Sequence, residues 1–208
     1  MRQSARVRRR RSLYIEVTIR ASPDEVWRLT QEPTEHPRWD LRFSRITPRP
    51  DEGTGPTRFV YERALPGHVI RGTGISLGEK QRTDGTRTSA LRFATKDPLS
   101  PLRDGRGYWW YTPTAEGVRF ITGFDYTPGF GALPDLLLRP VVRWMTAWSF
   151  DRLRIWAETG TPPERWPLRS CLQLWRPARP RAGRCRTRPP ARGAFADAPA
   201  TLRELTAP

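Results

Sequence analysis

Few side chains in this sequence fall into a pattern that could carry out covalent chemistry. Its 208 residues include two histidines, His36 and His68, and two cysteines, Cys171 and Cys185. Neither histidine stands in a recognisable arrangement with a serine or with Cys171, so nucleophilic catalysis has little support. These numbers also exclude a multi-histidine metal centre, a four-cysteine zinc site and a disulfide framework. Because there is no nucleotide-binding motif either, we expect neither a metal nor a cofactor.

General acid–base chemistry would need a carboxylate or a tyrosine inside a cavity. Tyr61, Tyr126, Glu62 and Asp125 lie in segments that alternate between apolar and polar residues. The alternation places Glu62 and Asp125 on the strand face opposite their aromatic neighbours, so we expect these carboxylates to be solvated or salt-bridged. Tyr61 and Tyr126 are the remaining polar candidates.

The histidines and one charged pair favour structural roles. His36 stands in a short predicted helix, where a packing or surface position is expected. His68 follows a Pro-Gly turn and is expected to be exposed. Asp40 and Arg42 have the spacing of a structural clamp at the start of a strand, and we favour this over a catalytic dyad.

The basic charge gathers at the two ends of the chain. Lysine and arginine total 37 against 21 acidic residues, a net charge of +16, and residues 1–11 hold six arginines and no acid. Residues 161–208 hold ten arginines, three acids and nine prolines, which is the composition of a solvated tail. We therefore predict a disordered basic arm at 1–11, a folded domain at 12–160 and a disordered Arg/Pro-rich tail at 161–208. Four apolar residues of the tail could dock back on the domain or contact a partner: Trp166, Leu172, Leu174 and Trp175.

No segment has the properties of a targeting signal or a membrane span. Glu16 and Thr18 interrupt the apolar residues that follow the basic arm, so we predict no signal peptide. No stretch approaches about 18 uninterrupted apolar residues, the length that a membrane span needs. We expect a cytoplasmic protein, which agrees with the sparse cysteines.

Apolar periodicity indicates the elements that would position these residues. Residues 13–20 alternate as a half-buried strand, and Ser22, Pro23 and Glu25 have the spacing of a helix start with a capping box. A second short helix is expected over 34–39. Short alternating segments with turn residues between them then predict an antiparallel meander, at 40–46, 58–64, 68–78, 88–96, 107–112 and 118–126.

The longest helical pattern runs from Asp135 to Thr159, with apolar residues at helical spacing on one face. Pro140 predicts a kink or the start of the main helix, and Gly160 predicts its end. The sequence therefore predicts an α+β fold with six or seven antiparallel strands, two short helices after the first strand and one long C-terminal helix.

The opening YIEVTIRASPDEVWRLTQEPTEHPRWDLRFSRI, at 14–46, resembles the START-like (SRPBCC) superfamily of helix-grip proteins, especially its polyketide cyclase/dehydrase branch. The long helix that ends near Trp156 resembles the gripping helix of that superfamily, and the likeness spans residues 12–160 without the two ends. The resemblance implies a curved sheet wrapped around the last helix, with a cavity between them. An open apolar cavity loses packing contacts along its walls, so it normally holds something.

Aromatic residues supply the walls of such a cavity. Strand alternation places several rings on common faces, and Trp144 and Trp148 lie one helical turn apart, where both would point toward the sheet. Indole N–H groups need partners, which suits a partly wet cavity. Core packing is the alternative role for each ring. The predicted ligand-binding residues are Tyr61, Phe93, Trp110, Phe120, Phe124, Trp144 and Trp148.

Three functions compete at this stage. The first is a carrier or sensor that binds a small hydrophobic or aromatic molecule in the cavity. The second is a cyclase/dehydrase-like enzyme that acts on a carbonyl-rich chain, which the resemblance implies and which holding a flexible chain in a reactive fold would support. The third is contact between the basic ends and nucleic acid or an anionic membrane.

Overall fold

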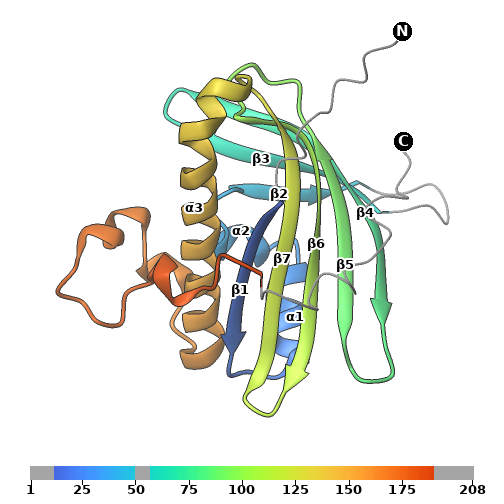
Figure 1. The fold of residues 1–208 in the computed structure, drawn as a ribbon, viewed down its shortest axis with the longest axis vertical. Helices are drawn as coiled ribbons and strands as arrows, with labels where there is room; N and C mark the ends of the chain where they lie inside the picture. The colour runs from blue at the N-terminus through green and yellow to red at the C-terminus, as the bar shows by residue number, and fades with distance from the viewer. Residues whose placement is uncertain (1–11, 50–56, 190–208) are drawn as a thin grey trace, which may run out of the picture.

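A computed structural model of the chain describes residues 12–49 and 57–189. The predicted arm at 1–11 and the last part of the predicted tail, 190–208, lie outside the described residues. The predicted α+β helix-grip architecture is confirmed, because one curved sheet wraps the long C-terminal helix (Figure 1).

The sheet contains seven antiparallel strands in the order β1-β7-β6-β5-β4-β3-β2. Apart from β1, which pairs with β7, the strands follow one another as the predicted meander. The second strand starts later than predicted, because residues 40–44 form a turn. The strands are β1 (Leu13–Ile19), β2 (Arg45–Pro48), β3 (Arg58–Leu65), β4 (His68–Gln81), β5 (Arg87–Ala94), β6 (Leu102–Thr114) and β7 (Gly117–Pro128).

Two short helices, α1 (Pro23–Gln31) and α2 (His36–Trp39), connect β1 to β2. Helix α1 begins as predicted, since the Ser22 hydroxyl accepts a hydrogen bond from the Glu25 backbone N–H at 3.2 Å. Helix α3 (Ala132–Thr159) continues through Pro140 and ends at Gly160, which adopts a left-handed conformation with φ of 70°.

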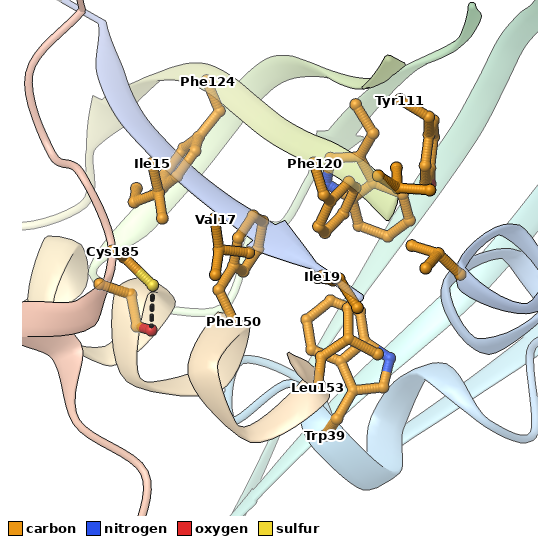
Figure 2. Close-up of a cluster of buried hydrophobic side chains, with 14 of the residues drawn as sticks. Ile15, Val17, Ile19, Trp39, Tyr111, Phe120, Phe124, Phe150, Leu153 and Cys185 are labelled. Atoms are coloured by element: carbon orange, nitrogen blue, oxygen red, sulfur yellow. Dashed lines mark hydrogen bonds between the residues drawn. The ribbon is translucent and has the colours of Figure 1, made fainter. Parts of the chain in front are cut away.

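The main hydrophobic core lies where α3 packs on β1, β7 and β6 (Figure 2). The Phe120 ring of β7 stacks on the Phe150 ring of α3, with 4.6 Å between the ring centroids. Trp39 of α2 meets the same Phe150 ring edge-on at 5.9 Å. Ile15 and Ile19 of β1 are fully buried beside these rings, so this half of the concave face is packed solid.

The segment after α3 packs on the domain instead of forming the solvated tail predicted from residue 161. It contains three short 3-10 helices, η1 (Pro163–Arg165), η2 (Leu168–Leu172) and η3 (Ala182–Arg184). Cys185 is buried, and its thiol donates a hydrogen bond to the Ala147 carbonyl at 3.2 Å (Figure 2). Arg186 exchanges two backbone hydrogen bonds with Glu16 of β1, each 2.9 Å long.

A buried carboxylate explains why this arginine-rich segment docks. Asp151 of α3 is fully buried and accepts hydrogen bonds from the Arg181 backbone N–H at 2.7 Å and the Arg184 guanidinium at 3.0 Å. Arg154 adds a third bond at 2.7 Å. A buried charge is costly unless it is paired, so Asp151 stabilises the docked segment more than composition suggests.

Candidate functional site

The other half of the concave face is hollow. A cavity of about 170 Å³ lies between the α1–α2 region and strands β2 to β6. Apolar cavities of about 150 Å³ can hold benzene, so this one has room for an aromatic ring or a short branched chain. No residue of α3 lines this cavity, which corrects the position predicted between the sheet and the C-terminal helix. Its apolar walls come from Phe43, Phe59, Tyr61, Leu91, Phe93 and Trp109.

Glycines allow three of these rings to lie flat on the sheet. Each ring covers a glycine directly opposite it on the neighbouring strand, where any Cβ atom would clash with the ring. The pairs are Tyr61 over Gly72, Phe59 over Gly74 and Phe93 over Gly105. Flat rings form a low apolar floor and leave the space above them open. Because these glycines have no side chain, the rings can approach the sheet backbone closely, and this close approach leaves room for the cavity.

A buried polar cluster borders the cavity at α2. The imidazole of His36 lines the wall, and its Nε2 lies 3.1 Å from Oδ2 of Asp40, which is fully buried. Arg42 grips the same carboxylate with Nε at 3.0 Å from Oδ1 and a terminal nitrogen at 2.6 Å from Oδ2. The predicted Asp40–Arg42 clamp is thus present. The ring of His36 packs between Trp39, stacked at 5.0 Å, and Trp109, edge-on at 4.8 Å.

The electrostatics of this cluster keep Asp40 ionised and His36 neutral. Burial alone would raise the pKa of Asp40, but the Arg42 charge and the hydrogen bonds from His36 and Arg42 outweigh it and hold the pKa well below its usual range. Burial lowers the pKa of His36, and the hydrogen bond to Asp40 only partly opposes this shift. Because an ionised carboxylate can only accept, Nε2 of His36 carries the proton, and Nδ1 keeps a lone pair able to accept one.

The Tyr61 side chain lies at the cavity wall. No hydrogen bond links it to any described residue, and burial raises its pKa to about 12, so it stays protonated near neutral pH. Two polar side chains of α1 that line the cavity are engaged with another tyrosine, since Gln31 Nε2 donates to the Tyr111 hydroxyl at 2.9 Å and the Thr30 hydroxyl lies 2.7 Å from the same oxygen. Tyr61 can therefore offer a hydrogen bond to a guest in the cavity.

The structure places only two of the predicted ligand-binding residues at this cavity. Tyr61 and Phe93 line it. Phe120 and Phe124 do face the concave side, but they belong to the packed core, where they are 0% and 4% exposed. They lie under α3, where helix side chains fill the space.

The three predicted tryptophans lie elsewhere. Trp110 faces the convex side of β6, where Arg82 lies over its ring at 5.4 Å, and its neighbour Trp109 takes the cavity position. Trp144 and Trp148 stack on each other at 6.4 Å. Trp148 is buried beneath Arg152, whereas Trp144 is 39% exposed, and neither lines the cavity.

Sequence reasoning missed His36 and Trp109 as cavity residues. The residues 108–111 are aromatic on both faces of β6, so their alternation cannot say which face is concave. Gly105 and Gly107 share the parity of Trp109 and could have given the signal, because a ring of β5 covers Gly105. No comparable signal marks His36.

The remaining polar candidates have ordinary partners. Glu62 pairs with Arg71 at 2.9 Å, as expected for a salt-bridged residue. His68 lies 2.9 Å from Asp97 with its side chain about one-third exposed. Tyr126 lies outside the cavity and donates a hydrogen bond to Asp135 at 2.8 Å. Within 12–49 and 57–189, no group of three His, Cys, Asp or Glu side chains is placed to hold a metal ion.

A curved antiparallel sheet, a long C-terminal helix and an aromatic cavity together define a helix-grip protein. A family model described as "Polyketide cyclase / dehydrase and lipid transport" matches residues 10–155, and the chain belongs to this family. The match covers the sheet and most of α3 and stops before the docked C-terminal segment.

The chain is also similar to individual proteins. The chain is 37% identical over 170 residues to the Uncharacterized membrane protein YndG of Bacillus subtilis, covering 79% of this chain and 63% of that protein. The chain thus spans less than two thirds of that relative's length. The fold is similar to that of a STAR-related lipid transfer protein from Xanthomonas axonopodis, with a TM-score of 0.53 and 18% identity over 67% of this chain and 81% of that chain. Human StAR-related lipid transfer protein 5 gives a TM-score of 0.54 and 16% identity over 70% and 74%.

The Bacillus subtilis relative is named a membrane protein, which stands against the predicted cytoplasmic compartment. In the described parts of this chain, no helix combines the length and apolarity that crossing a membrane requires.

Proposed function

We propose that the protein binds a small apolar or aromatic molecule in the cavity between the α1–α2 region and β2 to β6, as a carrier or sensor. The observation that carries this proposal is the floor of three rings lying on three glycines. Ordinary core packing would place side chains above such a floor, and empty apolar space loses dispersion contacts that a guest would restore. The description of the family includes lipid transport, and this is compatible with an apolar ligand.

The size and polarity of the cavity define the ligand class. A volume of about 170 Å³ accepts one ring or a short acyl end, with any longer part extending through the opening. One polar substituent would be favoured, because the Tyr61 hydroxyl makes no hydrogen bond to any residue that the structure describes. We therefore expect a phenol to bind more tightly than the corresponding hydrocarbon.

The test is titration of the full chain with toluene, p-cresol and anthracene, with binding measured by isothermal calorimetry or ligand-observed NMR. We expect saturable one-to-one binding of the single-ring probes, with p-cresol the tighter of the two and anthracene the weakest. Leu91→Trp and Ser76→Leu, which fill the cavity from two strands, should each weaken binding about tenfold or more. The matched control is Leu137→Trp on the exposed side of α3, which should bind normally. Absence of saturable binding, or normal binding by both filled variants, would refute the proposal.

A second candidate, an enzyme of the cyclase/dehydrase type, is favoured by the His36–Asp40–Arg42 cluster. A neutral imidazole held by a buried carboxylate can take a proton, and the Tyr61 hydroxyl can donate a hydrogen bond to a carbonyl oxygen. In that reaction Nδ1 of His36 would remove a proton from the carbon between two carbonyls, leaving an enolate that attacks a third carbonyl of the same chain. The protonated imidazole would then return this proton to the alkoxide that the attack forms.

This candidate is tested by measuring hydrogen–deuterium exchange at the central carbon of a 1,3-diketone bound to the protein. His36→Gln should lower the exchange rate about 100-fold or more and should still bind p-cresol. Tyr61→Phe should lower the exchange rate less. If the wild-type protein binds the diketone and the diketone exchanges no faster than in buffer, the enzyme hypothesis is refuted and the carrier hypothesis stands.

A further inference from the structure

The docked C-terminal segment carries an exposed apolar lobe. Residues 167–180, here called the C-terminal lobe, extend away from α3 as a loop (orange in Figure 1). Both of its ends are fixed to the domain. Before the lobe, Trp166 is buried and the Pro163 carbonyl accepts a hydrogen bond from Arg152 at 3.0 Å. After the lobe, the Arg181 backbone binds Asp151. The lobe is therefore presented in a set position by contacts that do not involve its outer side chains.

Large apolar side chains cover the outside of the C-terminal lobe. Leu172, Leu174 and Trp175 are 75%, 70% and 76% exposed, and Leu168 is 46% exposed. Trp166 is the only one of the four apolar residues singled out in the predicted tail that docks on the domain. Exposed apolar patches on soluble proteins often mark interaction sites, and the four exposed side chains lie within eight residues of the chain.

The charged residues of the lobe itself have one sign. Residues 165–188 contain eight arginines and no acidic residue. Within the lobe, Arg169 and Arg176 are exposed and form no ion pair with any described residue. The neighbouring acid, Glu164, is taken by Arg38 at 2.8 Å. Two exposed arginines on the same segment as exposed apolar side chains are complementary to a surface that is negative outside and apolar beneath.

We propose that the C-terminal lobe is a docking site for an anionic phospholipid bilayer. Leu172, Leu174 and Trp175 would enter the boundary between headgroups and acyl chains, while Arg169 and Arg176 contact lipid phosphates. A protruding tip suits a deformable bilayer, which needs no matching groove. Nucleic acid would satisfy the arginines but would leave the exposed leucines without an apolar partner. This proposal is independent of what the cavity binds.

The test is flotation of the full chain with phosphatidylcholine vesicles, with and without phosphatidylglycerol. We expect binding only when phosphatidylglycerol is present. A triple variant, L172S/L174S/W175S, keeps every arginine and should lose affinity by about tenfold or more. Arg169→Gln and Arg176→Gln should each lose about fivefold. Lipids brominated near the headgroup should quench part of the tryptophan fluorescence, and Trp175→Phe should remove that part.

The matched control is Leu133→Ser with Leu137→Ser, which are both 79% exposed on α3. This variant should bind vesicles as the parent protein does. The thermal unfolding midpoint of every variant should be unchanged, because none of these side chains is buried. Equal binding by the triple variant, loss in the α3 control instead, or a duplex DNA complex as tight as the vesicle complex would each overturn the proposal. A dimer that the triple variant abolishes, without vesicle binding, would also overturn it.

Discussion

The two halves of the concave face use aromatic residues in opposite ways. Under α3, the rings of Phe120 and Phe150 stack face to face at 4.6 Å and the space between sheet and helix is filled. At β2 to β5, rings such as Tyr61 lie flat on opposing glycines and the space above them stays open. Both halves belong to one continuous sheet, so the difference lies in what each ring faces.

This difference separates stability from binding. The packed half receives a long helix that brings its own apolar side chains to the sheet. The hollow half is covered by α1 and the four-residue helix α2, whose cavity-facing side chains include Gln31 and His36. Substitutions in the packed half should therefore act on unfolding, and substitutions in the hollow half should act mainly on the ligand.

Phe150→Ala should have the largest effect. The ring is fully buried and contacts both Phe120 and Trp39, so its removal leaves a cavity that the surroundings cannot close. We expect the free energy of unfolding to fall by about 3–5 kcal/mol, measured by urea denaturation with an unchanged slope. A loss below about 1 kcal/mol would show that this half is not densely packed.

Asp40→Asn should cost about 2–3 kcal/mol of unfolding free energy, since it removes a charged acceptor from Arg42 and His36.

The cluster also makes stability depend on pH. The folded-state pKa values of Asp40 and His36 are both lowered, so the unfolded chain binds protons more readily than the folded one. Protons therefore favour unfolding, and the contribution of each group is complete above its unfolded pKa and is lost as the pH falls through its folded pKa.

The two groups act in different pH windows. The loss from His36 begins below about pH 6.5 and that from Asp40 below about pH 3.9. Urea denaturation across this range should show stability falling toward acid, and His36→Gln should remove the part that begins near neutrality. Stability that rises below pH 6 in the parent protein would contradict the arrangement of this cluster.

Phe93→Ala sharpens the comparison, because it replaces a phenylalanine by alanine in the hollow half, as Phe150→Ala does in the packed half. Phe93 is only half-buried and borders existing space, so we expect a loss of about 1–2 kcal/mol in unfolding free energy. Affinity for p-cresol should fall about tenfold, because part of the cavity floor is removed. Equal unfolding costs for Phe93→Ala and Phe150→Ala would erase the distinction between the halves.

Trp144→Ala should have the smallest effect. Its ring is 39% exposed and stacks only on Trp148 among the ring contacts seen, so we expect a change of about 1 kcal/mol or less. Binding of p-cresol, followed by calorimetry, should be unchanged. A loss of binding would indicate that Trp144 lines the ligand cavity, as the sequence predicts.

Local patterns predicted the elements well because each pattern has a local cause. The alternation at β1, the Ser22 cap of α1 and the Gly160 stop of α3 depend on neighbours in the chain. The cavity was harder to place, because it depends on which strands α3 covers. His36 illustrates this, since only its three-dimensional neighbours, Trp39 and Trp109, make it a wall residue.

The C-terminal segment shows a different limit of sequence reasoning. Its proline and arginine content predicts a solvated chain, yet a single buried carboxylate, Asp151, binds its backbone and one of its arginines. Composition averages over a segment, whereas docking depends on a few exact partners that lie about 30 residues away in the sequence.

The most direct measurement is the X-ray structure of crystals exposed to xenon, which occupies apolar space large enough to hold it. The account predicts xenon density above the rings of Phe59, Tyr61 and Phe93, and none between Phe120 and Phe150. Absence of density above those three rings, or side chains that fill the space there, would contradict it.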